Sequence, residues 1–170
     1  MRTSIVLLMS VLLLSACASS PAWQSQLVDA TADGQALKTG ESRLAAVVHD
    51  GGLELRLRPV PSGVLVIVNT NRKTEITVDW EGCAFVWPDG KREAVLGATP
   101  LLGAGQIGLR APTALTPGLP VTLALTPASR AGREVFPLDT EYTGERFTLV
   151  LALIKNGEKK VYELSFTLSS

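Results

Sequence analysis

Hydrophobic and polar residues alternate with a period of two along much of the chain. In residues 52–58, leucines at 53, 55 and 57 alternate with charged residues at 54, 56 and 58. The same alternation returns in residues 76–80, 121–126 and 162–168, and in residues 147–153 a large apolar residue occupies every second position. Such alternation is typical of β-strands with one face on a core. Residues 64–68 are all apolar, which predicts a central strand buried on both faces.

Turn signals separate these segments. The run Pro88-Asp89-Gly90 predicts a hairpin between strands at 83–87 and 92–96, and Asn156-Gly157 predicts another between the last two strands. No segment has the periodicity of an amphipathic helix. The chain is therefore expected to be all-β, a single antiparallel β-sandwich that is immunoglobulin-like in architecture. It lacks the Cys–Trp–Cys spacing of a disulfide-bridged immunoglobulin domain.

The inward-facing positions of these strands predict the core. They are large aliphatic or aromatic residues spread over all the expected strands. The predicted core consists of Leu55, Val66, Ile76, Val78, Trp80, Phe85, Leu123, Leu149, Leu151, Leu164 and Phe166.

The N-terminal segment has a different pattern. Arg2 precedes residues 5–14, which are apolar except for Ser10. Ten helical residues span about 15 Å, which is half of a hydrocarbon core of roughly 30 Å. The segment is therefore expected to be a signal peptide and not a membrane-spanning helix.

The sequence Leu14-Ser15-Ala16-Cys17 follows and resembles the lipobox of bacterial lipoproteins. The resemblance implies a diacylglyceryl group on the Cys17 thiol, cleavage before Cys17 and acylation of the new amino group. Ala18 resembles the default signal for sorting to the outer membrane. The chain is thus expected in the bacterial envelope, anchored by lipid to the outer membrane and facing the periplasm.

These features divide the chain into three parts. Residues 1–16 are predicted to be the signal peptide. Residues 17–43, rich in Ser, Ala, Thr, Gln and Gly, are expected to be the acylated N-terminus and a flexible tether. Residues 44–170 are expected to form the β-sandwich domain.

Composition and charge narrow the function classes. The 16 basic and 16 acidic side chains cancel, which argues against a nucleic-acid partner. Hydrophobic residues make up 46% of the chain, too many for a disordered protein. His49 is the single histidine, and the two methionines lie in the N-terminal segment. No metal site or cofactor is therefore expected.

Few residues offer catalytic chemistry. His49 and Asp50 are adjacent on an expected strand and point to opposite faces, so they do not form a catalytic pair. The chain has no Gly-x-Ser-x-Gly nucleophile motif, and residues 104–108 lack the Gly-Lys-Ser/Thr of a phosphate loop. The chain is therefore expected not to be an enzyme.

Other residues leave alternatives open. Cys83 is either a buried, inert thiol or a partner for another chain in an oxidising compartment. Trp80 and Trp87 are either core residues or a platform for sugar rings. The carboxylates of Asp79, Glu81 and Asp89 either bind calcium or are solvated turn residues, and they lack the usual calcium-loop spacing.

The body of the chain carries a second resemblance. The runs are Val68-Asn69-Thr70-Asn71, Ile76-Thr77-Val78-Asp79-Trp80, Ala84-Phe85-Val86-Trp87-Pro88-Asp89-Gly90, Thr113-Ala114-Leu115-Thr116-Pro117-Gly118 and Pro137-Leu138. Over residues 45–168 the chain resembles a group of uncharacterised bacterial lipoproteins with an immunoglobulin-like sandwich. Cys83 departs from that pattern. The resemblance implies no activity or site residue.

An uncharged segment, residues 94–109, interleaves glycines with large apolar residues. These are Leu96, Leu101, Leu102, Ile107 and Leu109. An apolar loop either meets a partner or caps its own domain. The leading interpretation is a non-enzymatic lipoprotein that binds an envelope protein. The alternative is a binding module for a glycan or a small apolar molecule.

Overall fold

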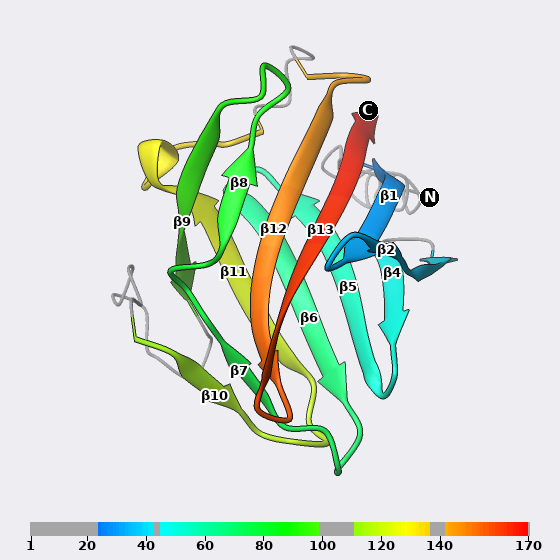
Figure 1. The fold of residues 1–170 in the computed structure, drawn as a ribbon. Helices are drawn as coiled ribbons and strands as arrows, with labels where there is room; N and C mark the ends of the chain where they lie inside the picture. The colour runs from blue at the N-terminus through cyan, green and yellow to red at the C-terminus, as the bar shows by residue number, and fades with distance from the viewer. Residues whose placement is uncertain (1–23, 43–44, 99–110, 137–141, 170) are drawn as a thin grey trace, which may run out of the picture.

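The computed structural model describes residues 24–42, 45–98, 111–136 and 142–169, and nearly all regular structure in these ranges is β-strand (Figure 1). The first strands are β1 (Gln24–Ala32), β2 (Gln35–Ala36), β3 (Lys38–Ser42), β4 (Ala45–Asp50), β5 (Leu53–Val60), β6 (Gly63–Thr70) and β7 (Ile76–Val78). The later strands are β8 (Ala84–Val86), β9 (Arg92–Ala98), β10 (Thr113–Leu115), β11 (Val121–Pro127), β12 (Arg146–Lys155) and β13 (Glu158–Ser169). One 3₁₀ turn, η1 (Ala128–Arg130), follows β11.

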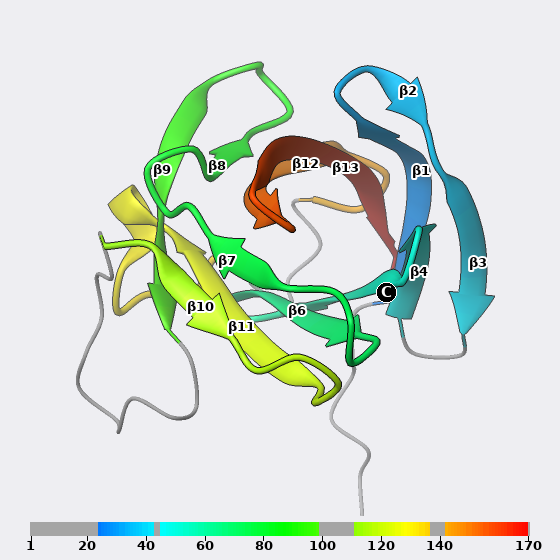
Figure 2. The ribbon, with the colours of Figure 1, turned by 60° about the horizontal axis from the view of Figure 1, so that its bottom comes forward.

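The strands form one hydrogen-bonded path, in the order β2-β1-β13-β12-β8-β9-β11-β6-β5-β4-β3, with β7 paired to β12 and β10. All these pairs are antiparallel. Figure 2 shows the path curling round, and β1 comes into contact with β3, β4 and β5. The predicted all-β, antiparallel class is confirmed. The immunoglobulin-like sandwich is not confirmed, because the continuous path curls nearly into a barrel.

Strand β9 connects two parts of the sheet, because it pairs with β8 on one side and with β11 on the other. Its beginning pairs with β8, and its end pairs with β11, where Gly97 lies opposite Leu125. A Cβ atom on Gly97 would lie 1.9 Å from the Trp80 ring. The indole therefore packs directly on the backbone of β9, and only glycine permits this approach.

All eleven predicted core residues are buried, with at most 3% of their surface exposed. The core continues into strand β12, where residues 149–153 are buried on both faces. The second face is covered near Ala152 by the turn that follows β7. There the Ala152 amide donates a hydrogen bond to the Cys83 sulfur at 3.4 Å. The doubly buried strand is therefore β12.

Residues 64–68 were predicted to be buried on both faces of their strand. The prediction is wrong for the face that carries residues 65 and 67. Leu65 and Ile67, which lie in β6, are only partly buried. Their cross-strand neighbours on β5 are Arg58 and Arg56, which are both exposed. The aliphatic stem of an arginine at such a position can cover apolar surface while its charged end stays accessible to water. A central strand of apolar residues therefore does not require a second packed layer.

Both predicted hairpins are confirmed. Strands β12 and β13 meet at Asn156-Gly157, and both turn residues have positive φ, 51° and 87°. That geometry fits the Asn-Gly turn. Strands β8 and β9 meet at the Pro88-Asp89-Gly90 turn, where the Gly90 amide donates to the Trp87 carbonyl at 2.9 Å.

The tether predicted for residues 17–43 is wrong over residues 24–42, which form β1, β2 and β3. Strand β1 pairs with β13 along most of its length. A register shift between Leu27 and Asp29 breaks the period of two, and the buried positions after it, Ala30 and Ala32, are small. These two features hid the strand in the sequence. Residues 17–23 lie outside the described ranges.

Candidate functional site

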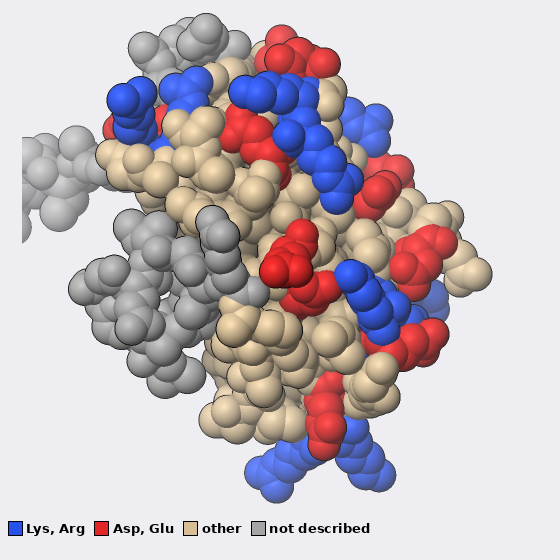
Figure 3. All heavy atoms as spheres, turned by 60° about the vertical axis from the view of Figure 1, so that its left-hand side comes forward, with Lys and Arg blue, Asp and Glu red and all other residues tan. Residues whose placement is uncertain are grey.

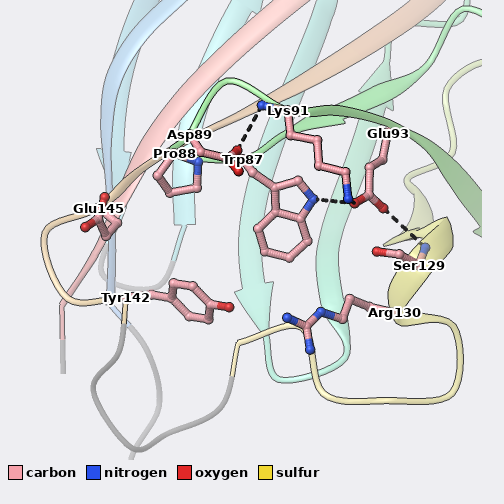
Figure 4. Close-up of a pocket in the computed structure, with 9 residues that line it drawn as sticks. All are labelled: Trp87, Pro88, Asp89, Lys91, Glu93, Ser129, Arg130, Tyr142 and Glu145. Atoms are coloured by element: carbon pink, nitrogen blue, oxygen red, sulfur yellow. Dashed lines mark hydrogen bonds and ion pairs between the residues drawn. The ribbon is translucent and has the colours of Figure 1, made fainter.

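A cavity of about 640 Å³ opens beside the β8–β9 hairpin (Figure 4). It is built by three segments that are distant in sequence: the β8–β9 turn, η1 and the turn before β12. Its lining residues are Trp87, Pro88, Asp89, Lys91, Glu93, Ser129, Arg130, Tyr142 and Glu145. The lining combines two aromatic rings with five charged side chains.

The aromatic floor of this pocket is anchored in the core. The Trp87 ring lies edge-on to Phe85 at a centroid distance of 5.0 Å and to Phe147 at 6.1 Å. Tyr142 packs on Phe147 at 5.5 Å and lies 6.3 Å from Trp87. Both rings therefore pack on buried phenylalanines, while one side of the floor stays accessible.

Glu93 is the polar centre of one wall, and its acceptors are occupied. The Trp87 indole nitrogen donates to Oε1 at 3.0 Å, Lys91 Nζ lies 3.0 Å from the same atom, and the Ser129 amide donates to Oε2 at 3.2 Å. A hydrogen bond from the Ser129 side chain, opposed by burial and reinforced by Lys91, lowers the pKa of Glu93 to about 2.

Its three donors make Glu93 a structural acceptor, and the lowered pKa keeps it ionised even at mildly acidic pH. Its ordinary pKa is 4.5. Because the folded-state pKa is lowered, its stabilising contribution is complete above the ordinary value and is lost as the pH falls toward 2. An ionised carboxylate with both oxygens engaged does not donate protons. The wall therefore orients Trp87 and η1 instead of offering acid–base chemistry.

Arg130 has different surroundings. Its guanidinium carbon lies 5.6 Å from the centre of the Trp87 ring, which is a cation–π contact. Among the described residues, the guanidinium has no hydrogen-bond or ion-pair partner besides this ring contact. Asp89 accepts a hydrogen bond from the Lys91 amide at 2.9 Å. Glu145 stands at the far end of the pocket, away from Arg130 (Figure 4).

The structure separates the two tryptophans that were predicted either as core residues or as a sugar platform. Trp80 is buried, and its indole nitrogen donates to Thr113 Oγ1 at 2.8 Å. Trp87 is only partly buried and lines the pocket. The core interpretation therefore holds for Trp80, and the platform interpretation stays open for Trp87 alone.

His49 and Asp50 point to opposite sides of β4, as predicted. His49 is half-exposed, and its Nδ1 lies 3.7 Å from Glu54 Oε2. Asp50 accepts a hydrogen bond from the Tyr162 hydroxyl at 2.7 Å and pairs with Lys155 at 3.0 Å. Burial raises the pKa of Asp50, but these two partners outweigh it and lower the pKa. Asp50 therefore joins β4 to the β12–β13 hairpin.

Cys83 is buried, with 2% of its surface exposed. The Sγ atom lies 3.3 Å from the Asp79 carbonyl oxygen, and burial raises the pKa of the thiol to about 11. A protonated, enclosed thiol is a poor nucleophile. The buried interpretation of Cys83 is therefore confirmed.

The carboxylates considered for calcium do not converge. Asp79 pairs with Lys159 at 2.7 Å, while Asp89 caps the backbone of its own turn. Among the described residues, no group of three or more His, Cys, Asp and Glu side chains is arranged to hold a metal ion.

The predicted interaction loop is only partly covered by the described ranges. Leu96 lies in β9, pairs with Thr126 and is partly buried, so assigning it to a loop is wrong. The strand extends through Ala98 because β11 supplies a partner. Cys17, Leu101, Leu102, Ile107 and Leu109 lie outside the described residues.

The sequence pointed to Trp87 and to the neighbouring turn at Pro88 and Asp89, but not to the pocket residues from other segments. Arg130 follows β11 in a segment with no clear periodicity, and Tyr142 precedes β12 in a similar segment. The sequence signal for Glu93 was limited to its place in a strand. These residues come together only because β8, η1 and β12 meet at one end of the fold.

Charge is mixed on the face that Figure 3 presents, where basic and acidic side chains alternate. Surfaces that bind nucleic acid concentrate positive charge, and this face does not. Within the described ranges, no helix is long and apolar enough to cross a membrane.

Comparison with known proteins identified no similar protein. No protein-family model matches the chain, and neither a curated protein nor a solved structure is significantly similar to it.

Proposed function

We propose that this chain is a lipid-anchored protein of the bacterial envelope that binds a glycan, without chemical turnover, in the Trp87 pocket. The observation that carries the proposal is the accessible aromatic floor of Trp87 and Tyr142 beneath polar side chains. Sugar rings present apolar C–H faces and polar rims, and this floor and its surroundings complement both. The proposed lipid anchor rests on the lipobox resemblance that ends at Cys17. We also propose that the chain is one of the lipoproteins with an immunoglobulin-like domain, which it resembles over residues 45–168.

The polar lining favours a sugar over a small apolar molecule. Sites for apolar ligands are mostly enclosed by hydrophobic side chains with few polar groups. This pocket instead has charged residues around its two rings: Asp89, Lys91, Glu93, Arg130 and Glu145. Burying an apolar molecule against these groups would remove their hydration without replacing it.

The first test is binding of cellotetraose to the full chain purified in detergent, measured by saturation-transfer NMR and calorimetry. We expect weak binding that Trp87→Ala reduces at least about tenfold, because truncating an aromatic anchor commonly costs about 2 kcal/mol. Trp87→Phe should retain most of the affinity. 1-Octanol serves as the apolar probe.

Leu119→Ala is the control, because Leu119 is exposed and does not line the pocket. Thermal unfolding of each variant separates loss of the site from loss of the fold. Tyr142→Ala provides a second variant of the floor if Trp87→Ala unfolds. The proposal is overturned if octanol binds and no tetrasaccharide does, or if the floor variants bind as tightly as the unmodified chain.

The anchor has its own test. When the chain is produced in a Gram-negative host, intact-mass analysis should give a protein that begins at Cys17 and carries acyl chains. Several chains at about 0.8 kcal/mol per buried CH₂ group would hold it in the membrane fraction. Cys17→Ala should leave the segment uncleaved and unacylated, with Cys83 as the internal control thiol. An unmodified Cys17 in the mature protein would contradict the prediction.

The protein-partner interpretation remains a prediction. It rests on the uncharged segment at residues 94–109, of which only 94–98 are described, and these form part of β9. Binding to an envelope protein would not require the Trp87 pocket. If the chain binds an envelope protein, crosslinking in native membranes should therefore capture the same partner with the Trp87→Ala variant as with the unmodified chain. The same variant should lose glycan binding in the calorimetric test.

A further inference from the structure

The Trp87 pocket is electrically asymmetric, and this asymmetry restricts the ligand. Arg130 stands at one end, and Glu145 stands at the other (Figure 4). The charge of Glu93 is already balanced by Lys91 at 3.0 Å, and the remaining acceptor positions of Glu93 are used by Trp87 and Ser129. Lys91 and Glu93 therefore form a neutral pair. Arg130 makes its end of the pocket positive, and Asp89 adds its negative charge to that of Glu145 on the side away from Arg130 (Figure 4).

Arg130 is held in an orientation suited to binding. The guanidinium lies 5.6 Å from the centre of the Trp87 ring. A guanidinium is weakly hydrated in general, and one that lies over a ring face can direct its N–H edge to an acceptor beside the ring. The preceding residue, Ser129, is tied to Glu93 through its amide at 3.2 Å, which fixes the backbone of η1.

The geometry points to an acidic sugar as the ligand, with its carboxylate bound by Arg130. A guanidinium edge matches a carboxylate through two parallel N–H···O bonds, which a neutral hydroxymethyl group cannot accept with the same strength. The sugar ring then lies along the floor of Trp87 and Tyr142. Glu145 repels a second acidic group at the far end, so one carboxylate is recognised.

This inference rests on the proposed function and specifies its ligand class. The test compares two ligands with the same β-1,4-linked glucose backbone: cellotetraose, and its terminal monouronate, in which the hydroxymethyl group of the non-reducing end alone is a carboxylate. Calorimetry on the full chain in detergent at neutral pH should show the monouronate binding roughly tenfold or more tightly. Raising the salt concentration should weaken this preference, because the contact is partly exposed.

Variants assign the preference to one side chain. Arg130→Gln should reduce the affinity ratio of the two ligands to about one. The ratio is measured on the same variant, so any general effect of the substitution on sugar binding cancels. Arg130→Lys should give an intermediate ratio, because an ammonium keeps the charge but loses the two-pronged geometry. Arg133→Gln is the matched control, since Arg133 is an exposed arginine that follows η1 and does not line the pocket.

The outcomes separate the two proposals. Equal affinity for both ligands, or a preference that survives Arg130→Gln, overturns the acidic-sugar inference and leaves glycan binding intact. Absence of binding for both ligands overturns glycan binding itself and the inference with it. Binding of the monouronate alone, lost in both Trp87→Ala and Arg130→Gln, supports both.

Discussion

Leu151→Ala is expected to lower the free energy of unfolding by about 2–5 kcal/mol, the range for truncating a buried leucine. Leu151 has no exposed surface and lies opposite Tyr162 in the β12–β13 pair. Its neighbours on β12 are buried on both faces of the strand, so surrounding side chains have little freedom to close the cavity. Urea unfolding of the full chain at neutral pH measures the change.

The loss is a large fraction of the stability of an ordinary domain, which is about 5–15 kcal/mol. Leu119→Ala is the matched control, because the same atoms are removed from a leucine that is 57% exposed. It should change the unfolding free energy by less than about 0.5 kcal/mol. Equal midpoints for the two variants would place Leu151 outside the core.

Gly97→Ala is the second substitution with a large expected effect. A Cβ atom at this position would lie 1.9–2.4 Å from three ring atoms of Trp80. The indole must then move, and its hydrogen bond to Thr113 at 2.8 Å is strained or lost. Overpacking of this kind costs about 1–3 kcal/mol and occasionally more. Urea unfolding and the near-ultraviolet circular dichroism of the tryptophans report the change.

Gly40→Ala provides the comparison for this substitution. Gly40 also lies in a strand, and the nearest atom to an added Cβ is that of Val47 at 3.9 Å, which is ordinary contact. The alanine should be accepted there with little loss of stability. If Gly97→Ala is as stable as Gly40→Ala and keeps the tryptophan spectrum, Trp80 does not pack against β9 as described.

Local patterns were sufficient for the strands and for much of the core. Alternation located β5, β11, β12 and β13, and all the residues placed in the core on that basis are buried. The Asn156-Gly157 turn was equally predictable, because its positive φ angles depend on two adjacent residues. Strand β1 was missed because a register shift at Leu27 and small buried alanines weaken the same signal.

The sequence by itself therefore determined the all-β class, the hairpins, the inward faces of the strands and the poverty of reactive side chains. Only the tertiary structure decided how the strand path curls, that Trp80 needs Gly97, and that Trp87 shares a pocket with Arg130 and Tyr142. The physical reason is the distance in sequence over which each feature arises. Alternation and turn preference arise between residues a few positions apart, whereas a pocket arises where segments distant in sequence pack side by side, and local patterns carry no information about that meeting.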